Sequence, residues 1–314
     1  MGQHNQTRIR EVVLLGFSGE QSINLCIFAV FLFAYLITIV GNTLIIITIL
    51  IDPRLNTPMY FFLCNLSFLD ICYTTSVAPQ LLTHLWTNRK TISFNRCMTQ
   101  LYIALSLGGT EFLLLAAMAY DRYVAVCHPL HYMVIMSRRK CIQIALAAWM
   151  GGFFNAVVQT VFTTNLHFYC FNSINHFTCE ILVVIKLACS FTFVNHIIFL
   201  VAGVIVLMIP FVVVLLSYVY IISAILRIRS SQGRKRAFST CSSHLTVVSL
   251  CFGTVIFAYG RPRANTSPNQ DKILTVIYSV LTPMLNPIIY SLRNKEVKRA
   301  LSNFVRKAFL LEKS

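Results

Sequence analysis

The sequence predicts an all-α membrane protein, a seven-transmembrane helix bundle followed by a short amphipathic C-terminal helix. Hydrophobic residues make up 57% of the 314 residues and charged residues only 11%, whereas a soluble domain carries roughly 25% charged residues. Seven stretches are almost free of charge, and each is long enough to supply the about 20 apolar residues that cross a bilayer as a helix. This composition excludes a disordered chain, a collagen and a coiled coil.

The expected spans follow one another without a domain boundary, so residues 1–314 form a single transmembrane domain. The stretches that define the spans contain no charged residue except Asp70 in the second and Glu111 in the third. The fourth and fifth stretches exceed one span, but their polar parts at 163–179 and 187–196 leave each as a single crossing. The spans cover about residues 25–51, 58–82, 97–121, 141–162, 197–226, 237–260 and 272–292.

Prolines mark expected irregularities in two of these spans. Pro210 is expected to interrupt the fifth span, and Pro283 and Pro287 are expected to kink the seventh, because each proline removes a backbone donor. A carbonyl freed in this way needs another partner in lipid. Asn286, beside Pro287, is the expected one.

The basic residues indicate the orientation of the chain. An odd number of spans places the termini on opposite sides, and with residues 1–24 extracellular, 17 Lys and Arg face the cytoplasm and 9 face outward. This bias follows the positive-inside rule and predicts a plasma-membrane protein with residues 293–314 as a cytoplasmic tail. The polar first 24 residues lack a signal-peptide core, so the first span is expected to direct insertion. The bases are spread over short loops, which excludes nucleic acid as a partner.

The tail repeats apolar residues at the spacing of one helical face. Val297, Leu301, Phe304, Val305 and Ala308 form the stripe, and five basic residues flank it. The pattern indicates an amphipathic helix over 294–308 that binds membrane lipid on the anionic inner leaflet.

The expected outer segments contain the residues suited to oxidising conditions. Asn5-Gln6-Thr7 is a glycosylation sequon. Four cysteines lie outside the spans and allow three pairings; they are Cys97, Cys170, Cys179 and Cys189. His176 stands three residues before Cys179 at a spacing suited to a soft metal ion. A disulfide at Cys179 is the favoured alternative, so we expect no metal site.

Asp70 and Glu111 are the acids expected deep within spans, where a central Asp costs about 2.5–3.5 kcal/mol on insertion scales. One interpretation is structural, a protonated carboxyl that bonds to Asn42, Ser67 or Asn286. The other is a cation or proton site whose occupancy differs between two states of the bundle. The residues themselves leave both open.

Asp121-Arg122-Tyr123 lies at the expected inner end of the third span. An interfacial Arg can simply extend its charge to water, but the adjacent Asp offers a charge partner that could be exchanged when helices move. Tyr218 and Tyr290 lie near inner ends, where an aromatic belt is the ordinary explanation.

One face of the third span is apolar and small. Gly108 and Gly109 remove side-chain volume there, either for close helix packing or for a pocket. The face comprises Leu101, Ala104, Leu105, Gly108 and Phe112.

Five blocks of sequence carry a resemblance to a known family. They are Gly41-Asn42; residues 55–63 (LNTPMYFFL) with Leu66-Ser67 and Asp70; residues 118–132 (MAYDRYVAVCHPLHY); residues 236–245 (RAFSTCSSHL); and residues 283–297 (PMLNPIIYSLRNKEV). In them the chain resembles the olfactory receptors of the tetrapod-type class, rhodopsin-like G-protein-coupled receptors. Order and spacing agree from about residue 41 to residue 301.

The resemblance implies roles for these residues. Cys97 would pair with Cys179, and Cys170 with Cys189. Asp121 would hold Arg122 at rest, and Arg122 with Tyr218 and Tyr290 would help to open the inner face to a stimulatory G protein of the olfactory type. The acids Asp70 and Glu111 match the family's paired acids, which favours a sodium-like ion site. Pocket positions implied by the family, beside those of the third span, are Ala202, Val206, Phe252, Tyr259, Thr275 and Ser279.

Two departures from the family pattern stand out. Asn56 replaces the usual His of the second-span motif, with little expected effect on ligand choice, and Phe252 replaces a frequent Tyr. The expected lining is therefore apolar with a few hydroxyls. It predicts a small, neutral, hydrophobic volatile ligand held by one hydrogen bond at most.

Other functional classes fit the sequence less well. It shows no nucleophile and base pairing of an enzyme, no Lys in 273–292 for a retinal protein and no repeated halves of a transporter. The alternative that remains is a receptor of the same fold with a non-odorant ligand outside the nose, which the tissue of expression would distinguish.

Overall fold

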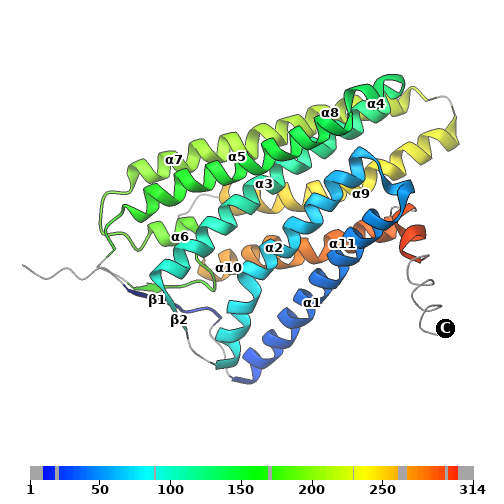
Figure 1. Ribbon diagram of the computed structural model, residues 1–314. Coiled ribbons are helices and arrows are strands. Elements are labelled where there is room, and N and C mark those ends of the chain that lie inside the picture. Colours follow the sequence, from blue (N-terminus) through cyan, green and yellow to red (C-terminus); the bar gives the residue numbers. More distant parts are fainter. Residues whose placement is uncertain are drawn as a thin grey trace, which may run out of the picture.

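The computed structural model describes residues 10–17, 21–87, 90–168, 172–228, 230–260, 267–293 and 296–302. Within these residues, seven helices are long and apolar enough to cross a membrane, which confirms the predicted seven-helix bundle (Figure 1). Four crossings are single α-helices: α1 (Gln21–Ile51), α2 (Pro58–Thr87), α3 (Phe94–Cys127) and α5 (Arg138–Thr164). The sixth is α9 (Ser231–Gly260).

The fifth and seventh crossings each contain a π-helical turn. The fifth runs through α7 (Phe193–Gly203), η3 (Val204–Met208) and α8 (Ile209–Leu226). The seventh runs through α10 (Pro268–Val276), η5 (Ile277–Leu281) and α11 (Thr282–Arg293). Short elements occupy the connections: η1 (Pro53–Leu55), η2 (Pro129–His131), α4 (Tyr132–Ile135) and α6 (Ile181–Ile185).

Helices α2 and α3 extend beyond the predicted spans. Helix α3 begins at Phe94, three residues before the expected start, because the Ser93 side chain caps it by accepting from the Arg96 N–H at 3.4 Å. Helix α2 continues to Thr87, five residues past its expected end. Apolar content locates the middle of a crossing, whereas caps and polar turns determine where its helix stops.

Two of the expectations about the prolines can be compared with the structure. The α-helical pattern of the fifth crossing is interrupted by the π-helical turn η3 just before Pro210, while the chain stays helical from α7 through α8. Pro287 has no N–H to offer the Pro283 carbonyl, and Asn42 Nδ2 from α1 donates to that oxygen at 3.2 Å instead. Asn286, the expected partner, donates to Asp70 Oδ2 at 2.9 Å.

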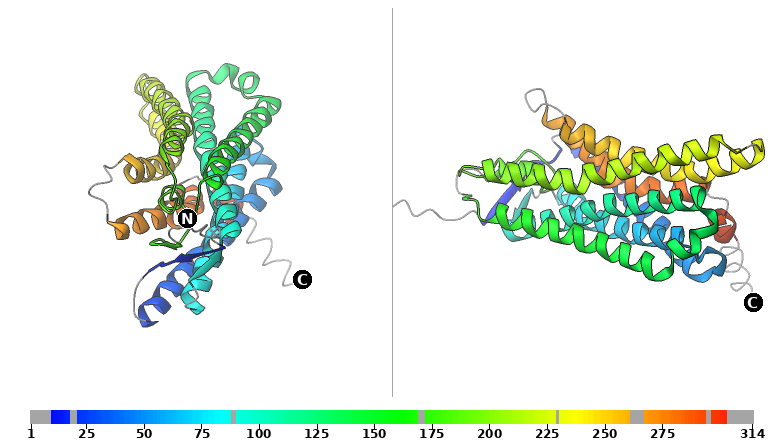
Figure 2. Two further views of the ribbon diagram at one scale, coloured as in Figure 1. Left: turned by 90° about the vertical axis from the view of Figure 1, so that its left-hand side faces the viewer. Right: turned by 90° about the horizontal axis from the view of Figure 1, so that it is seen from above.

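A three-stranded sheet, which the sequence did not predict, covers one end of the bundle (Figures 1 and 2). Its central strand β1 (Glu11–Leu14) pairs antiparallel with β2 (Thr91–Ser93) and parallel with β3 (Ser173–Ile174). We call this end of the molecule the sheet end, and the opposite end, where Arg122 lies, the Arg122 end.

Two further contacts fasten the sheet end. Lys272 Nζ of α10 donates to the Gly16 carbonyl at 2.6 Å and to Asn175 Oδ1 at 2.8 Å, and so joins the seventh crossing to the N-terminal segment. The disulfide between Cys97 and Cys179, as the family resemblance implied, ties α3 to the segment before α6. Of the other implied pair, Cys170 lies outside the described residues, as does Asn5.

The expected amphipathic helix is described in part. Residues 296–302 are helical, and Val297 and Ala300 of this segment are buried. Glu296 accepts a hydrogen bond from the Tyr60 hydroxyl at 2.7 Å, which holds the segment against α2. Residues 294, 295 and 303–308 of the predicted helix lie outside the described part.

Candidate functional site

A cavity of about 590 Å³ lies inside the bundle near the sheet end. Its walls come from α2, α3, α5, the fifth crossing, α9 and the seventh crossing, and Cys179, Glu180 and Ile181 contribute from the segment at the start of α6. Helix α3 presents to it the whole apolar face singled out in the sequence: Leu101, Ala104, Leu105, Gly108 and Phe112.

Seven of the ten predicted pocket residues line this cavity. They are Ala104, Leu105, Gly108, Gly109, Ala202, Val206 and Tyr259. The two glycines have different surroundings: a Cβ on Gly108 would meet nothing within 4 Å, whereas one on Gly109 would lie 3.1 Å from Val206 Cγ1 and 3.4 Å from Gly152 Cα. Gly108 therefore leaves open space, and Gly109 permits close packing between helices.

The other three predicted pocket residues do not line the cavity. The ring of Phe252 packs between those of Phe112 and Phe211, with centroids 4.9 and 5.4 Å away. The Ser279 hydroxyl donates to the Thr275 carbonyl at 2.6 Å, and the Thr275 hydroxyl donates to Glu180 at the same distance. Both hydroxyls are thus occupied by bonds within the protein.

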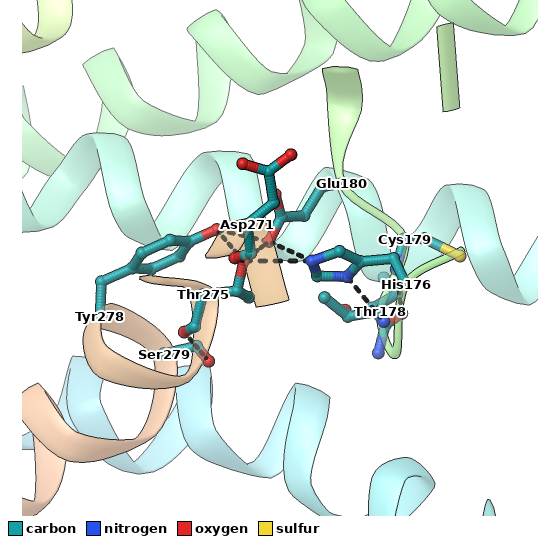
Figure 3. A network of polar contacts seen from close by, with 9 residues as sticks. His176, Thr178, Cys179, Glu180, Asp271, Thr275, Tyr278 and Ser279 are labelled. Carbon is teal, nitrogen blue, oxygen red and sulfur yellow. Dashed lines mark hydrogen bonds and ion pairs between the residues drawn. The ribbon is translucent and has the colours of Figure 1, made fainter. Parts of the chain in front are cut away.

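Glu180 and its partners form a polar network beside the cavity, drawn in Figure 3. Glu180 Oε1 accepts from the Thr275 hydroxyl at 2.6 Å and from the Tyr278 hydroxyl at 2.5 Å. His176 Nδ1 accepts from the Thr178 N–H at 3.3 Å, so the neutral ring carries its proton on Nε2. That nitrogen lies 3.2 Å from Thr275 Oγ1 and 3.8 Å from Glu180 Oε1.

The sequence did not single out Glu180 as a pocket residue. It stands in a loop, and no helical or strand period assigns a loop side chain to one side of the fold. With Glu111 it gives the cavity two carboxyl groups, where we expected an apolar lining with a few hydroxyls. Among the described residues no group of three or more His, Cys, Asp or Glu side chains could hold a metal ion, and Cys179 beside His176 is already in a disulfide.

Asp70 and Glu111 have separate partners in the middle of the bundle. Asn286 Nδ2 donates to Asp70 Oδ2 at 2.9 Å, and Cys251 Sγ donates to Glu111 Oε1 at 3.2 Å. Asn42 gives its amide hydrogens to the carbonyls of Thr38 and Pro283 rather than to Asp70.

Three buried oxygens in this region accept no hydrogen bond in the described structure. They are Asp70 Oδ1, Asn42 Oδ1 and Asn286 Oδ1. Oxygen ligands of this kind suit a small hard cation, and an unpaired buried acceptor is costly. The residues present therefore fit a sodium ion or a proton.

At the Arg122 end, Asp121 binds two different partners. Its Oδ2 lies 3.8 Å from Arg122 Nε, and its Oδ1 accepts from the Tyr132 hydroxyl of α4 at 2.8 Å. Burial raises the pKa of Tyr132, and the charge of Asp121 raises it further, so Tyr132 remains a donor at neutral pH. The side chains of Asp121 and Arg122 are 0% and 10% exposed, which makes this a largely desolvated pair.

Within the described part of the chain, no hydrogen bond joins Arg122 to Tyr123, Tyr218 or Tyr290. Tyr123 bonds to His128 Nε2 at 3.1 Å, and Tyr218 of α8 bonds to His244 Nδ1 of α9 at 2.7 Å. The hydroxyl of Tyr290 is buried and has no partner in the described structure. The structure thus brings Asp121 and Arg122 together and links α8 to α9 through Tyr218.

Comparisons with known proteins agree on one family. The sequence model of the family "Olfactory receptor" matches residues 31–308. The chain is 53% identical over 300 residues to the olfactory receptor-like protein OLF3 of Canis lupus familiaris, covering 96% of this chain and 95% of that protein. It is 51% identical to the Homo sapiens olfactory receptor 2F1, with the same coverage, and 46% identical to the Homo sapiens olfactory receptor 13C9, covering 98% of this chain and 99% of that protein.

Proposed function

Since the chain belongs to the olfactory receptor family of rhodopsin-like G-protein-coupled receptors, which are not enzymes, we propose that it is a receptor for a small, neutral, hydrophobic volatile. Ligand binding in the cavity activates a stimulatory G protein of the olfactory type and raises cyclic AMP. The observation that carries this proposal is the cavity of about 590 Å³, whose lining is mostly aliphatic and aromatic. Volumes of about 300–1,000 Å³ are usual for small-molecule sites.

In the proposed orientation the sheet end is extracellular and the Arg122 end is cytoplasmic, at the plasma membrane. The excess of Lys and Arg at the Arg122 end supports this, because short cytoplasmic loops carry such an excess. The disulfide at the sheet end supports it as well, since disulfides persist in oxidising compartments. The same end would carry a glycan on Asn5 and a second disulfide between Cys170 and Cys189.

The proposed signalling step is a population shift between two states of the bundle. In the resting state Asp121 lies between Arg122 and Tyr132, and Tyr218 is bonded to α9. A ligand favours the state in which the Arg122 end is open, where Arg122 is released and can meet Tyr218, Tyr290 and the G protein. The tail helix stays on anionic lipid of the inner leaflet.

Asp70 and Glu111 would hold a sodium ion or proton that stabilises the resting state. The three buried oxygens without donors, on Asp70, Asn42 and Asn286, support this proposal. A cation bound there would supply the missing electrostatic partner, and movement of α11 against α2 would alter its binding.

A panel of volatiles with cyclic AMP as the readout tests the function. We expect neutral hydrophobic compounds to activate the receptor, and Arg122→Ala to abolish the response while surface expression persists. Arg54→Ala is the matched control, because Arg54 is 68% exposed and pairs with Asp52 outside the bundle. A stronger response to protonated amines or carboxylates than to neutral analogues, or intact signalling by Arg122→Ala, would contradict the proposal.

A further inference from the structure

We infer that Glu180 selects the ligand by accepting a hydrogen bond from its hydroxyl group, so that the receptor takes neutral alcohols in preference to ketones, aldehydes or ethers of the same carbon skeleton. The inference rests on the proposed function, because it names the class of volatile that binds in the same cavity. It is carried by the contacts of the Glu180 carboxylate.

The Glu180 side chain contacts the seventh crossing at the cavity and does not cap its own helix. It is the residue before α6, where an Asp, Asn, Ser or Thr side chain commonly caps the first turn, yet the Glu180 side chain makes no cap bond. It reaches instead to the seventh crossing, where Thr275 and Tyr278 bind it (Figure 3). The adjacent Cys179 is fixed to α3 by its disulfide, so the position of the carboxylate is held from two sides.

The carboxylate retains an unused acceptor. Both hydroxyl donors bind Oε1, and no described residue donates a hydrogen bond to Oε2. The side chain is 17% exposed, and Glu180 is one of the residues that line the cavity. An ionised carboxylate offers about four lone-pair sites, so a ligand donor can bind without displacing Thr275 or Tyr278.

The Glu180 carboxylate itself favours a ligand that carries a hydrogen-bond donor. No Lys or Arg is among the described lining residues, so a ligand does not compete with a cationic side chain for Glu180. At Glu180 a ketone, aldehyde or ether brings only acceptors and would set its oxygen against the carboxylate, so it must turn to the amides of Asn155 and Gln159 elsewhere in the lining. Glu111, the other acid of the lining, is held by the weak thiol donor of Cys251 and is less firmly positioned.

A protonated amine fits less well than an alcohol. Two short hydrogen bonds already stabilise the charge of Glu180. Moving an ammonium group from water into the mostly apolar cavity carries a large desolvation penalty, which its attraction to a carboxylate must first offset, whereas a hydroxyl incurs a much smaller penalty. A hydroxyl supplies one donor and remains neutral.

The experiment measures cyclic AMP dose–response curves for matched sets that share one carbon skeleton: the alcohol, the aldehyde or ketone, the methyl ether and the primary amine. For the unmodified receptor we expect the alcohol to have an EC50 about ten to a hundred times lower than the other three, the range expected for one hydrogen bond to a charged group. Glu180→Gln should lose this preference and gain response to the ketone, because its amide offers a donor. Glu11→Gln, the same change at the exposed first residue of β1 and outside the cavity lining, should keep the preference.

The outcomes separate the inference from the proposed function. If ketones, ethers or amines match the alcohols on the unmodified receptor, or if Glu180→Gln keeps the preference, the inference is wrong while the receptor function stands. If a surface-expressed receptor responds to no volatile of any class, the proposed function is wrong and the inference with it. Even if Glu180→Gln fails to reach the surface, the absence of an alcohol preference in the unmodified receptor would contradict the inference.

Discussion

Replacing Gly152 by Ala should push α3 and α5 apart. A Cβ at this position would lie 2.6 Å from the Ser106 carbonyl oxygen and 2.8 Å from the Thr110 nitrogen, and it would also overlap the Thr110 hydroxyl oxygen. Two of these three atoms belong to the α3 backbone, so a change of rotamer cannot relieve the contact. Ordinary van der Waals contact begins near 3.4 Å, which requires α3 to retreat by about 0.6–0.8 Å in a closely packed interior.

The magnitude follows from two opposing effects. Overpacking of this kind costs about 1–3 kcal/mol, while Ala in place of Gly favours the helix by up to about 1 kcal/mol. With the full helix gain subtracted, we expect Gly152→Ala to lose up to about 2 kcal/mol of stability. Gly253→Ala is the matched control, because Gly253 lies in α9 and a Cβ there would meet nothing within 4 Å, which leaves only the helix gain.

The assay compares the two variants for surface expression and for the temperature of half-inactivation after solubilisation in detergent. Gly152→Ala should fall below the unmodified protein in both, and Gly253→Ala should equal or exceed it. Equal stability of the two variants would refute the account of the α3–α5 contact.

Three further changes test other contacts. Tyr132→Phe removes the hydroxyl that holds Asp121, a bond to a charged group worth about 1.5–3 kcal/mol, and basal cyclic AMP should rise at equal surface expression; unchanged basal activity would contradict its resting role. Lys272→Gln should speed hydrogen exchange of the β1 amides, because it weakens two bonds to the N-terminal and loop segments; unchanged exchange would mean that the strand pairs alone hold the sheet. Asn42→Ala leaves the Pro283 carbonyl without its donor and should cost about 1–3 kcal/mol in thermal stability, and no loss would show that water replaces the amide.

The sequence predicts the crossings well because lipid imposes one strong condition on every spanning segment. A run without charges can be recognised from the residues alone. The two acids within such runs, Asp70 and Glu111, indicate helix faces that point into the interior of the bundle. The apolar face of α3 follows from helical spacing, which is why all of its members reach the cavity.

Contacts between distant segments were beyond prediction from the residues. The strands of the sheet are two to four residues long and show no usable alternation. The bond from Asn42 to Pro283 spans 241 positions, and proximity in sequence pointed to the neighbouring Asn286 instead. Glu180 belongs to the same group, since only the folded chain shows that it reaches Thr275 and Tyr278.

The pairing of the sheet fixes the order in which parts of this protein can fold during synthesis. Strand β1 leaves the ribosome first, yet its parallel partner Ser173–Ile174 is made about 160 residues later, a delay of about ten to thirty seconds at ordinary rates of synthesis. Until then at least one edge of β1 has open hydrogen-bonding groups, exposed to chaperones and to other chains. Strand β3 follows the fourth crossing in the chain, so the sheet can close only after that crossing has been inserted. A closed sheet therefore requires that the first four helices are already in the membrane.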